Sequence, residues 1–206
     1  MSQQETEITV VSAAAVVRSR ADQYLDLGDP ELAAKLVVQS LCHAIDEAMD
    51  GRCTTASLRV AQNGLAEIHY DAGMPLQEDE FEPGQSVAVS LFRVLLACHS
   101  RKKHLEVGTE LCEIGLAVLN AVCSELTAEI VEGGRTASLR FAEGELLEET
   151  SSQPATGADC TRIRFRLDAS VLPNTRPDTG SLRKTVARLQ QQLPQLRMDL
   201  QIDDGV

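Results

Sequence analysis

Two tight hairpins constrain the fold of this chain more than any other feature of its sequence. In each, two short runs alternate polar and apolar residues, and a glycine-containing pair lies between them. The first joins 55–61 to 65–70 through Asn63–Gly64, and the second joins 127–132 to 135–142 through Gly133–Gly134. Such pairs between alternating runs indicate antiparallel turns. The chain therefore predicts a sheet with antiparallel pairs and one apolar face.

Helical periodicity marks four further segments, namely 30–50, 85–98, 111–126 and 180–193. In the first, Pro30 suits the first turn and Gly51 suits the position after the last turn. Additional strand patterns are 160–167, 197–203 and a short run at 6–11, which fits an edge strand or an arm. The stretches 71–84 and 149–159 are predicted loops.

Helical segments dominate the first part of the chain and strands dominate the later part. This order predicts an α+β fold, a two-layer α/β sandwich with a mixed β-sheet covered on one face by helices. A length of 206 residues suits one domain over 1–206, with residues 1–16 as an N-terminal arm.

The formal net charge of −12 argues against a nucleic-acid partner, because a field of that sign repels phosphate backbones. We therefore expect no direct DNA binding. Three short basic clusters are interpreted as solvated faces. They are Arg18–Arg20, Arg101–His104, and the alternating Arg162, Arg164 and Arg166.

Six cysteines without a C-x-x-C pair are typical of buried thiols in a reducing compartment, and they indicate neither a zinc site nor a disulfide framework. The first residues lack a basic segment followed by an apolar one, so no secretory signal is predicted. No run of about 18 apolar residues occurs, so we expect no membrane span and a cytoplasmic location.

Four motifs in the same order resemble the ATPase domain of gyrase B, a member of the histidine-kinase-like (GHKL) ATPase fold. The family motifs are V-R-x-R-P-x-M-Y-I-G, E-x-x-x-N-A-I-D-E-A, V-V-N-A-L and G-T-x-V-x-F. They are matched in part by Val17–Leu25, Gln39–Ala48, Val118–Val122 and Cys160–Phe165, the last including Thr161. The resemblance covers about 6–205, and it implies an ATP site with Mg²⁺.

Key positions of that implied site differ here. The family uses a carboxylate on the first helix to activate water, and this chain has Gln39. Losing a general base costs ~10²–10⁴ in rate. One turn later the family's Mg²⁺-ligating Asn is His43, and imidazole is a poor ligand for magnesium. We interpret His43 as a wall residue with an ordinary hydrogen bond. Asp46 and Glu47 persist, and the family uses the second to support the fold and a nearby arginine.

The adenine-binding motif D-x-G-x-G-[IM]-P is incomplete. Counting back from Met74, Gly73 matches the second glycine and His69 takes the adenine-reading aspartate's position. A two-residue contraction would instead make Asp71 the aspartate and Gly73 the first glycine. Both alignments stay open, and 71–73 also fits a plain turn.

The lid motif G-x-x-G-x-G is matched by Glu110, Glu113 and Gly115. In the family its glycines let backbone N–H groups approach the triphosphate. Two glycines have become carboxylates, and like charges 4 Å apart repel by about 4 kcal/mol at an effective dielectric near 20. We therefore predict no hydrolysis and no ATP or Mg²⁺ cofactor.

The function expected from these changes is that of a gyrase-B-like pseudo-ATPase acting as a binding or regulatory module. The alternative is a divergent ATP-binding protein or slow ATPase related to type II topoisomerases. The expected partner is a protein, with a topoisomerase subunit as a candidate, and a homodimer stays open. No match to the family's transducer domain is present, and no aromatic precedes Tyr24 in the arm.

Overall fold

The computed structural model describes residues 11–101, 110–152, 154, 155 and 157–203. The edge strand or arm predicted at 6–11 lies almost wholly outside them, and so does most of the basic cluster at 101–104. The side chains of Glu110 and Glu113 are likewise outside the described part, although their backbones belong to a helix.

Seven strands form one mixed sheet in the order β5-β4-β3-β6-β2-β1-β7. β1 and β7 run parallel, and the other described pairs run antiparallel. The strands are β1 (Thr55–Val60), β2 (Leu65–Tyr70), β3 (Cys123–Glu132), β4 (Arg135–Ala142), β5 (Glu145–Ser152), β6 (Cys160–Leu167) and β7 (Arg197–Ile202).

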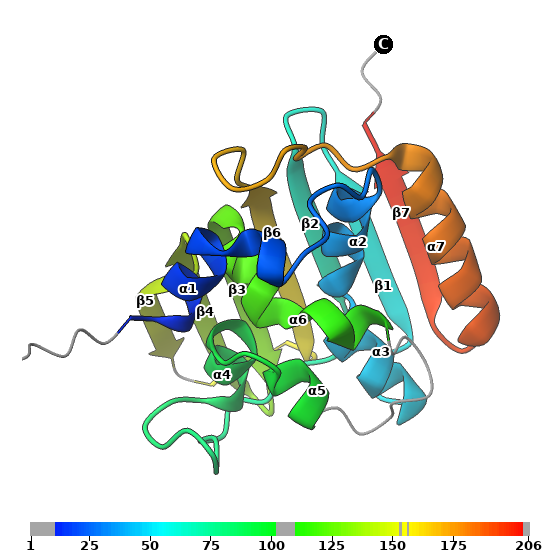
Figure 1. Cartoon of the computed structure of the whole chain (residues 1–206). Helices are drawn as coiled ribbons and strands as arrows, with labels where there is room; N and C mark the ends of the chain where they lie inside the picture. Colours follow the sequence, from blue (N-terminus) through cyan, green and yellow to red (C-terminus); the bar gives the residue numbers. More distant parts are fainter. Residues whose placement is uncertain (1–10, 102–109, 153, 156, 204–206) are drawn as a thin grey trace, which may run out of the picture.

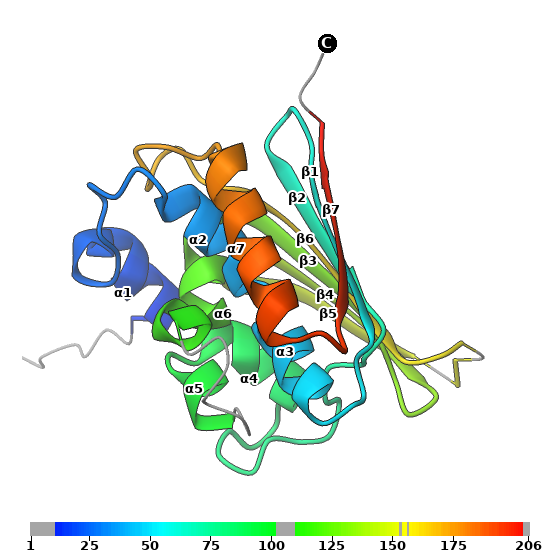
Figure 2. The same ribbon diagram turned by 90° about the vertical axis from the view of Figure 1, so that its right-hand side faces the viewer.

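Helices cover one face of this sheet, which confirms the predicted two-layer α+β sandwich (Figures 1 and 2). They are α1 (Ala13–Ser19), α2 (Leu32–Gln39), α3 (Cys42–Met49), α4 (Val87–Arg93), α5 (Ala97–Arg101), α6 (Glu110–Ala121) and α7 (Thr179–Gln192), with a short 3₁₀ turn η1 at Ala21–Gln23. Among the described residues no helix is both long and apolar enough to cross a membrane.

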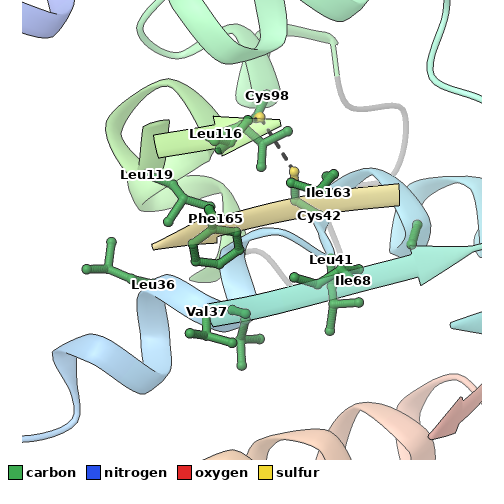
Figure 3. Close-up of a cluster of buried hydrophobic side chains, with 14 of the residues drawn as sticks. Leu36, Val37, Leu41, Cys42, Ile68, Cys98, Leu116, Leu119, Ile163 and Phe165 are labelled. Atoms are coloured by element: carbon green, nitrogen blue, oxygen red, sulfur yellow. Dashed lines mark hydrogen bonds between the residues drawn. The ribbon is translucent and has the colours of Figure 1, made fainter. Parts of the chain in front are cut away.

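The core lies between the helices and the sheet, where alternate strand residues meet helical side chains (Figure 3). β6 shows the pattern plainly, because Ile163 and Phe165 are buried while Arg162 and Arg164 face away from the helices. Leu36 of α2 and Leu119 of α6 belong to the same core cluster. Alternation in the strands therefore decides which side chains face the helix layer.

Both predicted hairpins are confirmed. Asn63–Gly64 joins β1 to β2, and Gly133–Gly134 joins β3 to β4. Gly133 and Gly134 have φ of 56° and 76°, the left-handed conformation that a two-residue turn of this type requires. Gly51, also left-handed, follows the end of α3 as predicted.

The single helix predicted over 30–50 is two helices in the structure. Ser40 ends α2, and its hydroxyl donates to the Val37 carbonyl over 2.6 Å. The Ser40 N–H bonds the same carbonyl, three residues back, which tightens the turn before α3 begins at Cys42. A local hydrogen bond thus breaks a helix whose apolar periodicity continues.

Two other predicted helix boundaries were wrong. The helix expected over 85–98 ends at Arg93; Val94 is extended and Leu96 has a φ of 64° before α5 begins. The helix expected over 111–126 ends at Ala121, and β3 starts at Cys123. Apolar runs cross both boundaries because short neighbouring elements bury their residues in the same core.

The loop predicted over 149–159 was also partly wrong, because its first residues belong to β5. Glu143 and Gly144 form the turn from β4 to β5, with φ of 53° and 84°. β5 is an edge strand with a polar sequence, so it lacks the apolar alternation that reveals a strand. Residues 13–16, assigned to an arm, form the first turns of α1.

Candidate functional site

Gln39 lies at the end of α2, where it meets a kink in α6. Gly115 interrupts α6 with φ 79° and ψ 164°, a conformation that is not helical. The Gly115 N–H donates to Gln39 Oε1 over 3.1 Å, and the Gln39 side chain is buried. The glutamine side chain therefore joins the end of α2 to the backbone of α6 at the kink.

The next N–H along α6 is also bound inside the protein. Leu116 N–H donates to Cys98 Sγ of α5 over 3.3 Å. Two consecutive donors of the predicted lid segment thus contact neighbouring helices.

His43 points from α3 toward β2. Its Nδ1 lies 3.1 Å from the Tyr70 hydroxyl, and its Nε2 lies 3.8 Å from Glu47 Oε1. Tyr70 is 1% exposed, so its ring fills space between the sheet and α3. Burial raises the pKa of Tyr70 well above its ordinary value, although a hydrogen bond with Thr161 opposes the rise. The phenol therefore stays neutral and serves as a hydrogen-bonding partner.

Glu47 supports the turn that leads from α3 into β1. Its carboxylate accepts a 2.5 Å hydrogen bond from Arg52 Nε, and its carbonyl accepts the N–H groups of Arg52 and Cys53. The hydrogen bond to Glu47 raises the pKa of Arg52. Glu47 therefore holds the segment that follows α3. Asp46, beside it, is also buried.

Asp71 binds the start of β1. Its carboxylate accepts hydrogen bonds from the backbone N–H groups of Thr54 and Thr55 at 2.8 Å, and from the Thr54 hydroxyl at 2.5 Å. Burial acts to raise the pKa of Asp71, but these hydrogen bonds outweigh it and hold the pKa well below the ordinary value.

Thr161 of β6 holds the loop after Asp71. Its hydroxyl donates to the Ala72 carbonyl over 2.8 Å and accepts the Met74 N–H over 3.0 Å. Gly73, between them, passes so close to β3 that a Cβ there would lie 2.4 Å from the Val131 carbonyl oxygen. The strand motif and the loop motif are therefore one packed unit.

The two candidates for the adenine-reading position lie in different places. His69 occupies the face of β2 opposite to its buried neighbours and pairs in register with Arg162 of β6. With Glu129 and Arg162 it lines a cavity of about 320 Å³ on the open side of the sheet. Asp71 follows the end of β2, where its carboxylate binds the start of β1. The structure thus places Gln39 and His43 on the helix side of the sheet and His69 on the open side.

Two residues of this region were not singled out from the sequence. Tyr70 had a usable signal, because it follows Ala66 and Ile68 on the alternating face of β2. Cys98 had none, since its contacts with Cys42 and Leu116 depend on how α5 packs.

Cavities elsewhere are larger. One of about 510 Å³ lies between α1, α4 and β5, and another of about 660 Å³ lies beside the β3–β4 turn. Their described walls include none of the predicted site residues. Among the side chains that the structure describes, no cluster of three or more His, Cys, Asp or Glu could hold a metal ion.

Comparison with known proteins finds gyrase B and a related topoisomerase subunit. The chain is 28% identical over 88% of its length to gyrase B of Chlamydia muridarum, and 25% identical over 82% to gyrase B of Treponema denticola. It is 26% identical over 94% of its length to the corresponding type 2 topoisomerase protein of Aquifex aeolicus. No protein-family model matches.

The chain spans only about a quarter of these relatives, covering 24–26% of their length. The chain is thus similar to gyrase B, and this similarity supports a topoisomerase-related ATPase-like domain.

Proposed function

We propose that this gyrase B-like domain does not hydrolyse ATP and acts as a binding or regulatory module. The observation that carries the proposal is the Gln39–Gly115 hydrogen bond. In this bond the residue at the general-base position accepts the N–H of the lid glycine, so each group is already engaged by the other.

The first support concerns the chemistry at position 39. Hydrolysis requires a group that takes a proton from water, and an amide cannot do so near neutral pH. The Gln39 oxygen, moreover, already accepts a backbone N–H in a buried place. We expect the rate loss for a missing general base, ~10²–10⁴, to apply in full.

The second support concerns nucleotide binding. The resemblance implies that lid N–H groups contact a triphosphate, yet Gly115 donates to Gln39 and Leu116 donates to Cys98. A phosphate would have to replace both contacts. His43, at the magnesium-ligand position, lies against the buried Tyr70 hydroxyl, and imidazole is a weak partner for this oxygen-preferring cation. These described residues do not fit ATP and Mg²⁺.

The partner that we propose is a protein. The relatives are named as components of gyrase and of a type 2 topoisomerase, so a topoisomerase subunit is the first candidate. A domain that retains the fold and loses the nucleotide contacts retains surfaces through which another protein can bind.

Thermal unfolding with and without millimolar ATP and Mg²⁺ tests the proposal. A nucleotide at 100 times its Kd would add about 2.7 kcal/mol, or roughly 5–10 °C in Tm for a domain of this size. We expect no shift. A clear shift would support the alternative, a divergent ATP-binding protein or slow ATPase, which the similarity to gyrase B and the ordered Thr161–Met74 loop favour.

Two variants separate binding from chemistry. Restoring the lid glycines with Glu110→Gly and Glu113→Gly should return weak nucleotide binding without phosphate release, and adding Gln39→Glu should be required for turnover. ATP hydrolysis by the unmodified chain that disappears in Gln39→Ala would overturn the proposal.

A further inference from the structure

Two thiols from distant parts of the sequence meet under the predicted lid. Cys42 is the first residue of α3 and Cys98 belongs to α5, and their sulfur atoms lie 3.5 Å apart (Figure 3). Both residues are 5% exposed. A disulfide requires the sulfurs to approach to about 2.05 Å, a movement of about 1.5 Å.

Hydrogen bonds distinguish the two sulfurs. Cys98 Sγ lies 3.5 Å from the Cys42 sulfur and accepts a hydrogen bond from the Leu116 N–H over 3.3 Å. Donors directed at a sulfur stabilise negative charge on it, and the thiolate is the form that attacks an oxidant. Cys98 is therefore the nucleophile of the pair, and Cys42 is placed to resolve the product.

The backbone around Cys98 allows the required movement. α5 has only five residues, and it follows Leu96, which is exposed and has a φ of 64°. A left-handed leucine is strained, so rotation there toward the ordinary region relieves strain while it moves α5. Cys42, in contrast, lies on a buried helix.

Burial keeps two other cysteines protonated. Burial raises the pKa of Cys53 to about 12, and it raises the pKa of Cys123 well above the ordinary value. Both thiols therefore stay protonated near neutral pH. Cys160 is half-buried on β6 and serves as a comparison.

We propose that Cys42 and Cys98 are a redox modification site that hydrogen peroxide converts to a reversible disulfide. The Cys98 thiolate attacks one peroxide oxygen, giving a sulfenic acid and hydroxide. The Cys42 sulfur then attacks the Cys98 sulfur and expels the sulfenic oxygen, which leaves as water, so that two thiols and one peroxide yield one disulfide and two waters.

The disulfide would tie α5 to α3. Cys42 directly precedes His43, and Cys98 contacts Leu116, the neighbour of Gly115. The disulfide would therefore fix α5 against α3. This inference rests on the thiol geometry and is independent of whether the domain binds ATP.

Peroxide treatment of the purified full chain, followed by thiol counting in denaturant and peptide mapping, tests the site. We expect the six thiols of the sequence to fall to four, with a Cys42–Cys98 peptide that dithiothreitol releases. The crosslink closes a long loop, so Tm should rise by roughly 5–15 °C.

Variants provide the controls. Cys42→Ala and Cys98→Ala should each abolish the crosslink and the Tm rise, whereas Cys160→Ser should retain both. The proposal fails if the wild-type map joins Cys98 to another cysteine. It fails equally if six thiols remain after peroxide treatment. Both outcomes are measured on the wild-type chain, so they do not depend on whether a variant folds.

Discussion

Glycine is required at position 73 because the backbone there passes close to β3, and not because the position has an unusual backbone angle. Its added Cβ would lie 2.4 Å from the Val131 carbonyl oxygen and 2.6 Å from Glu132 Cβ. The turn glycines differ, since Gly133 and Gly134 are needed for their positive φ. At Gly73 the loop after β2 is pressed against the end of β3, and Thr161 holds it there.

Replacing Gly73 by alanine should therefore destabilise the domain by about 1–3 kcal/mol, because a methyl group would have to displace backbone. Urea unfolding measures the change. Gly157→Ala is the matched control, since a Cβ there would meet no atom within 4 Å, and it should stay within about 0.5 kcal/mol of wild type. Equal costs for the two variants would contradict the steric explanation.

Asp71 should make stability depend on pH in the acid range. Its folded-state pKa lies below the unfolded value of about 3.9, so its contribution is present above that value and is lost as pH falls toward the folded pKa. The stability difference between wild type and Asp71→Asn should therefore be largest at neutral pH and shrink below about pH 4.

Carboxyl titration by NMR gives an independent check on Asp71. Thr54→Val removes the hydroxyl donor and should move the Asp71 pKa back toward its ordinary value. An unchanged Asp71 pKa in that variant would show that the backbone donors of Thr54 and Thr55 alone hold the carboxylate.

At the scale of elements, the kink divides α6 into two segments that meet different neighbours. Gly115 takes a conformation suited to glycine, and the N–H groups of Gly115 and Leu116 donate to α2 and α5. Two neighbouring N–H groups at the kink thus make bonds between helices, and Gln39 is the α2 partner.

Gln39→Met preserves side-chain size but removes the acceptor, so it should lower the free energy of unfolding by about 1–3 kcal/mol because a buried hydrogen bond between α2 and α6 is lost. Urea unfolding and faster hydrogen exchange at Gly115 would report the loss. The control is Gln192→Met on the exposed end of α7, for which we expect a change within about 0.5 kcal/mol.

At the scale of the whole molecule, the open face of the sheet is a network of opposite charges. The arginines of β6 each pair with a carboxylate on a neighbouring strand: Arg162 and Arg164 with Glu129 at 3.5 and 3.6 Å, and Arg166 with Glu125 at 2.8 Å. Arg164 also bonds Glu67, which lowers the pKa of that carboxyl. The alternating arginines therefore do not form an isolated basic patch.

We accordingly expect no retention of duplex DNA at physiological salt, as measured by electrophoretic mobility shift. The net charge of −12 opposes approach, and the β6 arginines already have carboxylate partners. Salt-sensitive binding that disappears when Arg162, Arg164 and Arg166 become Gln, but persists when three arginines elsewhere are replaced, would contradict this expectation.

Much of the architecture could be predicted because its causes are local. The turns at Asn63–Gly64 and Gly133–Gly134, the alternation of β6 and the cap after α3 involve neighbours in sequence. The errors arose where local patterns continue across a boundary, as at Ser40, or where an edge strand such as β5 lacks an apolar face.

The sequence by itself determined the strand faces, the turns and the replaced residues at family motif positions, because period and residue type belong to short segments. Only tertiary structure decided that Gln39 would bond Gly115, 76 residues away, that Tyr70 would meet His43, and that Cys42 would lie beside Cys98. Those contacts depend on how helices pack on a shared sheet, and a backbone N–H carries no residue-specific signal of its partner.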